Sequence, residues 1–113
     1  MHEYSIASSL LGMAEEQVAK HAAARVLGLE LRIGELAGVE VELLETAWSL
    51  VRERSCCEAA DLAITRIEAC WNCTRCGGDI ARGGLLVCPG CGGTARLVSG
   101  DELVLDRIEM EVN

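Results

Sequence analysis

Aromatic side chains and lysine are scarce in this chain of 113 residues. It has no phenylalanine, one tyrosine, two tryptophans and the single lysine Lys20. The nine arginines are dispersed rather than gathered in a stripe, and the formal net charge is −8. Nucleic-acid binding needs basic surface for phosphates and, for single strands, aromatic rings for bases. We therefore expect no nucleic-acid ligand, and expect cations or basic protein surfaces as partners.

Long apolar runs are also missing. No window approaches the length of a membrane span, and no basic segment followed by an apolar stretch opens the chain. The seven cysteines are an odd number, which argues against a disulfide framework. We therefore expect a cytoplasmic protein in a reducing compartment, without a membrane partner.

Four cysteines form two Cys-x-x-Cys pairs separated by eleven residues, and each pair is followed by Gly-Gly. Thiolates at this spacing suit one tetrahedral, closed zinc site, and the glycines allow the backbone to turn sharply under the metal. The competing interpretation is a set of disulfides or scattered buried thiols. The repeat favours structural zinc, bound by Cys73, Cys76, Cys88 and Cys91.

Three further cysteines need separate interpretation. Cys70 lies three residues before Cys73, so the pair Cys70/Cys73 is an alternative first hairpin. The shared Cys-Gly-Gly ending favours Cys73 with Cys76, which leaves Cys70 as a spare thiol. Cys56 and Cys57 are adjacent and have no further partners nearby, so we expect free thiols near a helix end.

Hydrophobic periodicity predicts an α+β fold of two helices packed on a three-stranded sheet, with the zinc module inserted between strands two and three. Trp48 is the expected core anchor of the second helix, and a slip in alternation suggests a bulge in the second strand. The expected units are an α+β domain, residues 1–69 and 99–113, and a zinc module, residues 70–98. The predicted elements are helices at about Tyr4–Leu27 and Val41–Arg54, and strands at Leu29–Gly34, Leu62–Ile67 and around Ile108–Val112.

The opening Met1-His2-Glu3 is a candidate second metal site. The Met1 amine, the amide and imidazole of His2 and the amide of Glu3 can close fused chelate rings on one ion, and square-planar nitrogen ligation selects nickel(II) or copper(II). A carboxylate such as that of Glu3 would instead favour weaker, octahedral binding. The competing interpretation is a frayed chain end. We expect His21 to face solvent, and Glu40 to matter only if the fold brings it to Met1.

Met1-His2-Glu3-Tyr4-Ser5, Ile33-Gly34-Glu35, the two cysteine pairs and the closing strand around Ile108-Glu109 together resemble the HypA/HybF family of hydrogenase maturation nickel metallochaperones. The resemblance spans the chain. It implies a nickel site at His2 with Met1 and Glu3 as backbone partners, Glu40 as a weaker ligand, and structural zinc at the four cysteines.

The same resemblance implies delivery of nickel for [NiFe]-hydrogenase maturation and, in some organisms, for urease. Its expected partners are a nickel-binding GTPase and the hydrogenase large-subunit precursor, and the chain is expected to be a monomer or homodimer. The residues themselves leave two rivals, a rubredoxin-like electron carrier and a zinc-ribbon interaction module. An enzyme is not expected, because no nucleophile and base pair is recognisable.

Overall fold

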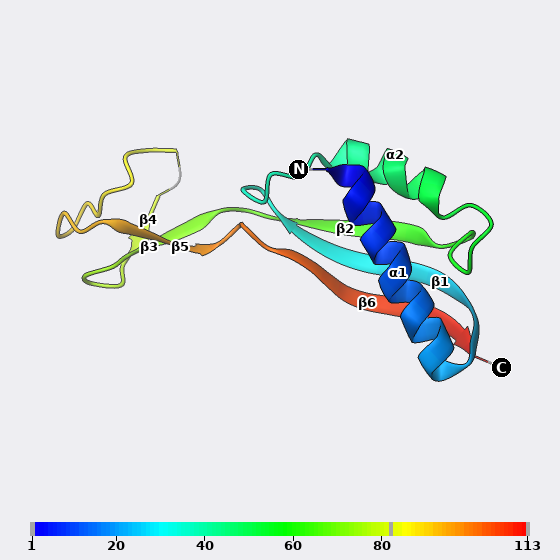
Figure 1. Cartoon of the computed structure of the whole chain (residues 1–113). Helices are drawn as coiled ribbons and strands as arrows, with labels where there is room; N and C mark the ends of the chain where they lie inside the picture. Colours follow the sequence, from blue (N-terminus) through cyan, green and yellow to red (C-terminus); the bar gives the residue numbers. More distant parts are fainter. Residues whose placement is uncertain (1, 82, 113) are drawn as a thin grey trace.

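A computed structural model describes residues 2–81 and 83–112. The molecule is elongated, 58 × 26 × 16 Å. At one end is the body, in which two helices cover a three-stranded sheet; at the other is the arm, residues 70–99, with a small sheet of its own (Figure 1). Along the chain the elements are α1 Glu3–His21, β1 Ala23–Gly34, α2 Val41–Val51, β2 Asp61–Ile67, β3 Cys70–Cys73, β4 Asp79–Ile80, β5 Ala95–Ser99 and β6 Leu103–Val112.

The predicted class, two helices on a three-stranded sheet with a four-cysteine unit, is confirmed. The body sheet has the order β2-β1-β6, in which β1 is parallel to β2 and antiparallel to β6. The arm sheet has the order β4-β3-β5 and is antiparallel. All three arm strands fall between β2 and β6 along the chain. None of the described helices is long and apolar enough to cross a membrane.

The first helix ends six residues before the predicted end. It stops at His21, where Ala22 adopts a left-handed conformation with φ 51°, and β1 begins at Ala23. Gly28, which follows the predicted end of the helix, lies within β1. The alanine-rich stretch favours a helix locally, but Val26 is fully buried and pairs with Met110 of β6. Tertiary pairing therefore overrides helix propensity here.

Both helices pack on one face of the body sheet. Leu29, Leu31 and Ile33 alternate along β1 and are buried against the helices. Trp48 of α2 is 2% exposed, as expected of a core anchor, and its indole N–H donates to the carbonyl of Ala60 at 3.0 Å. The core therefore lies between helices and sheet.

Two further predictions, the end of α2 and a bulge in β2, need correction. α2 ends at Val51 rather than Arg54, since Arg54 has a positive φ of 58°. The bulge suggested in β2 is absent, because β2 pairs with β1 residue by residue from Asp61 to Ile67. The irregularities lie instead between β1 and β6, where the register shifts at three places.

Two glycines allow body and arm strands to cross closely. A Cβ at Gly34 would lie 2.1 Å from the backbone of Gly100, and one at Gly100 would lie 2.5 Å from the Cα of Ala69. Gly100 also has φ +114°, a conformation that side chains rarely adopt. Only glycine therefore fits at this junction.

Carboxylates complete the junction. The backbone N–H of Ala69 donates to Glu35 at 2.7 Å, and that of Gly100 donates to Glu102 at 2.6 Å. Each bond ties a segment that leads into or out of the arm. The arm thus joins the body through hydrogen-bonded backbone rather than a free linker.

Candidate metal centres

The four predicted cysteines converge at the tip of the arm. Their sulfur atoms all lie within 4.8 Å of one another, although the pairs are eleven residues apart in sequence. Cys73 and Cys91 are 3.4 Å apart, and Cys76 and Cys88 are 3.7 Å apart. Four sulfurs about 2.3 Å from one zinc ion would lie roughly 3.8 Å from each other. The donor set and its spacing therefore suit zinc.

The two halves of this cluster have the same local structure. Gly77 donates to the carbonyl of Cys73 at 3.0 Å, and Gly92 donates to that of Cys88 at 2.9 Å. Both glycines have a positive φ, +76° and +74°. Each hairpin thus turns through a left-handed glycine, which explains the repeated Gly-Gly.

The second glycine of each pair closes the turn. The backbone N–H of Cys73 donates to the carbonyl of Gly78 at 2.8 Å, and the backbone N–H of Cys88 donates to that of Gly93 at 2.9 Å. A Cβ at Gly93 would lie 2.5 Å from the sulfur of Cys73. The backbone therefore has to pass directly beside the thiol cluster.

Backbone N–H groups prepare the cluster for a cation. The N–H groups of Cys76 and Arg75 donate to the Cys73 sulfur at 3.4 and 3.3 Å, and they lower the pKa of Cys73 to about 6. The N–H of Gly93 acts in the same direction on Cys91, but the neighbouring thiols outweigh it and raise the pKa of Cys91 to about 12. Four negative sulfurs repel one another, so full ionisation requires a bound cation.

The remaining cysteines lie outside this cluster. Cys70 is exposed at the start of β3, opposite Ser99, and is not among the converging thiols. Cys56 and Cys57 follow α2 as free thiols whose sulfurs are 3.9 Å apart. Burial, followed by the neighbouring Cys56, raises the pKa of Cys57 to about 12. Cys57 therefore acts as a small core residue.

The predicted second site lies where the first turn of α1 meets the start of α2 (Figure 1). The carboxylate of Glu3 accepts a hydrogen bond of 3.0 Å from the backbone N–H of Glu40, the residue that precedes α2. This bond, together with the N–H of Glu3 itself, lowers the pKa of the Glu3 carboxyl. The fold thus brings Glu40 beside Glu3, although they are 37 residues apart.

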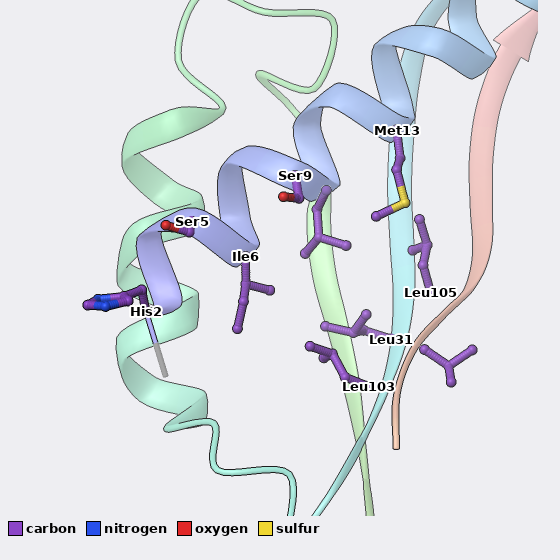
Figure 2. A pocket seen from close by; sticks show the side chains of 10 residues that line it. His2, Ser5, Ile6, Ser9, Met13, Leu31, Leu103 and Leu105 are labelled. Atoms are coloured by element: carbon purple, nitrogen blue, oxygen red, sulfur yellow. The ribbon is translucent and has the colours of Figure 1, made fainter. Parts of the chain in front are cut away.

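His2 is exposed, and its imidazole points away from the apolar side chains below α1 (Figure 2). It is therefore open to an incoming ion. Met1, the fourth predicted member of this site, lies outside the described residues. His21, predicted to face solvent, is exposed at the end of α1.

Sequence reasoning missed the structural role of the Glu3 side chain. Glu3 was expected to contribute chiefly its backbone amide, yet its carboxylate holds the loop before α2. An acidic residue beside a helix start is common, so the sequence carried no signal for this long-range bond.

Comparison with known proteins identifies the family of the chain. A family model described as hydrogenase/urease nickel incorporation, metallochaperone, HypA, matches residues 1–110. The hydrogenase maturation factor HypA of Nitrosospira multiformis is 38% identical over 112 residues, which cover 97% of each chain. That of Aquifex aeolicus is 35% identical over the full length of both chains.

Solved structures show the same similarity. The solution structure of the Ni metallochaperone HypA from Helicobacter pylori is 30% identical, with a TM-score of 0.71 over 100% of both chains. Another solution structure of a HypA protein has a TM-score of 0.79 and a sequence identity of 30%, and the match covers 100% of this chain and 98% of the other. With matching family, fold and cysteine cluster, the chain belongs to the HypA family of hydrogenase and urease nickel-incorporation metallochaperones.

Proposed function

We propose that this chain carries Ni(II) at Met1, His2 and Glu3, with Glu40 as a weaker additional ligand, and delivers it for [NiFe]-hydrogenase maturation. The observation that carries the proposal is the bond from the Glu40 N–H to the Glu3 carboxylate, which joins the starts of both helices next to His2. The exposed imidazole of His2, next to the hydrogen-bonded Glu3, can both bind the ion and release it to a partner.

The two metal centres suit different tasks. Four thiolates leave no open position on zinc, so the arm site is structural. A chain that begins at Met1 supplies an amine, an imidazole and backbone amides, which together prefer nickel(II) or copper(II). Because His2 is exposed, a better ligand set on a partner can remove the ion. We assign the chain no catalytic role.

The partners follow from the same proposal. They are a nickel-binding GTPase and the hydrogenase large-subunit precursor, in the cytoplasm, with urease as a further client in some organisms. The net charge of −8 favours basic protein surfaces and disfavours nucleic acid. Association should weaken as salt rises, because the charges involved are exposed.

Two variants test the nickel site. His2→Ala removes the imidazole, and a Gly-Ser extension before Met1 keeps every side chain but converts the terminal amine into an amide. Both should abolish stoichiometric nickel binding in a calorimetric titration, because each removes one member of the chelate. Zinc content, measured by elemental analysis, should stay at one per chain.

Glu40→Gln provides the graded control, since it removes a carboxylate while keeping the backbone N–H that Glu3 binds. It should weaken nickel binding without abolishing it. If the extended protein binds one nickel with unchanged affinity and spectrum, the amine is not a ligand. A site of His2 with the Glu3 and Glu40 carboxylates would then replace the proposed one.

A further inference from the structure

An apolar groove of about 640 Å³ lies between α1 and the edge of the body sheet, beside His2. In Figure 2 the apolar side chains of α1 face those of the strands across this space. Met13 is 43% exposed and Leu103 37% exposed, so the groove leaves large apolar side chains in contact with water. Its lining includes Ile6, Leu10, Met13, Leu31, Leu103 and Leu105.

One wall of the groove is an edge strand. The sheet order β2-β1-β6 leaves the outer edge of β6 without a neighbour among the described strands. Such an edge presents backbone N–H and C=O groups that can pair with another chain. Along the groove the strand is regular, because Leu103, Val104 and Leu105 pair in unbroken register with Ile33, Arg32 and Leu31. The nearest register shift comes directly after Leu105, where Asp106 is left out of the pairing, and the other two lie farther along, so Leu103–Leu105 is the regular part of this edge.

The groove includes the strand's backbone as well as its side chains. Leu103 and Leu105 pair with the buried Ile33 and Leu31 and so face the helices, whereas Val104 belongs to the opposite face. All three residues nonetheless line the groove. An extended segment lying there can therefore pair with β6 and place every second side chain under α1.

Charge indicates what kind of segment fits. Of the 18 acidic residues only Asp79 lies within residues 70–99, whereas three of the ten basic residues do. The rest of the chain thus has 17 acidic and seven basic residues, a formal charge of −10. A second hollow shares Met13 and Leu105 with the groove, and its charged lining is mixed, with Glu16 and Asp106 beside Arg107 and His21. This body attracts basic segments and repels a second copy of itself.

We propose that the edge of β6 accepts an extended segment of a partner protein, with apolar side chains at alternate positions and lysine or arginine between them. The apolar side chains fill the groove, the backbone pairs with Leu103–Leu105, and the cations face the acidic body. The function of this contact rests on the proposed nickel role of His2, because a partner segment bound in the groove would lie beside the ion that is transferred.

The test uses the full zinc-bound chain labelled with ¹⁵N and a synthetic peptide that alternates valine and lysine. One control peptide has the same composition with the valines consecutive, and another has glutamate in place of lysine. The alternating peptide should shift the amide signals of β6 around Leu103–Leu105 and of α1, and slow hydrogen exchange at the β6 edge. Equal binding of the consecutive-valine peptide, or shifts confined to other surfaces, would overturn the proposal.

Variants distinguish binding in the groove from nonspecific binding to other exposed apolar side chains. The double variant Met13→Ser with Leu103→Ser should weaken binding of the alternating peptide about tenfold, because two apolar side chains that contact it are lost. Leu50→Ser, at an apolar side chain 60% exposed on α2 and outside the groove, should leave binding unchanged. A chain that dimerises without peptide, and becomes monomeric in the groove variant, would show that a second copy covers the edge and would contradict the proposal.

Nickel binding is measured on the same variants. It should be unchanged by Met13→Ser with Leu103→Ser, since neither residue is a proposed ligand. Loss of peptide binding with intact nickel binding then tests the groove alone, and loss of nickel in His2→Ala with intact peptide binding tests the metal site alone.

Discussion

At the scale of single residues, Cys73 and Cys57 are the same residue type in opposite environments. The pKa of Cys73 is lowered to about 6 by the backbone N–H groups of Cys76 and Arg75. The pKa of Cys57 is raised to about 12, chiefly by burial. Because a metal binds the thiolate, the first environment favours a ligand and the second favours an inert core thiol.

Single substitutions should distinguish these roles. Cys73→Ser should release zinc, because three remaining thiolates cannot complete the tetrahedron. Cys70→Ser is the matched control, since Cys70 lies three residues before Cys73 but outside the cluster, and this variant should keep one zinc per chain by elemental analysis. Zinc retained in Cys76→Ser but lost in Cys70→Ser would instead identify Cys70 and Cys73 as the first pair.

At the scale of elements, the junction between body and arm depends on backbone packing rather than on side-chain bulk. Gly34 and Gly100 approach so closely that neither tolerates a Cβ without displacement of backbone. Glu35 and Glu102 accept backbone N–H bonds on the two connecting segments. The orientation of β3 and β5 relative to the body is therefore set at this crossing.

Gly100→Ala should destabilise the protein by about 2 kcal/mol or more, because it combines a positive φ with a clash against Ala69. Gly84→Ala is the matched control, since a Cβ there meets nothing within 4 Å and its φ is not in the left-handed region. Urea unfolding curves give both values. Similar small losses for the two variants would show that the crossing relaxes easily.

The junction should also respond to pH through Glu102. Its own backbone N–H and that of Gly100 hold the pKa of this carboxyl below the usual value of 4.5. A lowered pKa contributes stability that is present above the unfolded value and is lost as pH falls through the folded value. The difference in Tm between wild type and Glu102→Gln should therefore be largest near neutral pH and shrink below about pH 4.5. A difference that grows on acidification would contradict this role.

At the scale of the whole molecule, body and arm have separate cores of very different size. The body buries side chains from both helices and β1. Among the described residues, the only buried apolar side chains of the arm are those of Cys73, Ile80 and Cys88, with Trp71 and Ala95 packed beside them. So few apolar contacts cannot balance the entropy of ordering about 30 residues, so the arm requires its metal.

Zinc removal should therefore unfold the arm and spare the body. A structural zinc site contributes about 10 kcal/mol or more to the folding of small modules, far above what this small core supplies. After chelation, hydrogen exchange should become fast in β3–β5 and stay slow in β1, and added zinc should restore protection. Simultaneous loss of protection in β1 would show that the two parts fold as one unit.

Local chemistry made much of this protein predictable from its sequence. The spacing of Cys73, Cys76, Cys88 and Cys91 specifies a cluster because each pair closes its own turn and needs only to meet the other. Trp48 was a reliable core residue because helical periodicity reports burial. The family was recognisable because each motif that carries the resemblance, such as Met1-His2-Glu3 or a Cys-x-x-Cys pair, is contiguous in the chain.

Tertiary structure decided what depends on residues far apart. α1 ends at His21 because β1 pairs early with β6, which no local preference for helix could reveal. Glu40 meets Glu3 because α1 and α2 start at the same end of the sheet, and the apolar groove exists because β6 is an edge. Sequence by itself determines turns, metal ligands and the apolar faces of helices and strands, because these depend on residues that are near one another in the chain. Tertiary structure decides which helix ends and strand edges meet, because strand pairing depends on burial summed over the whole core.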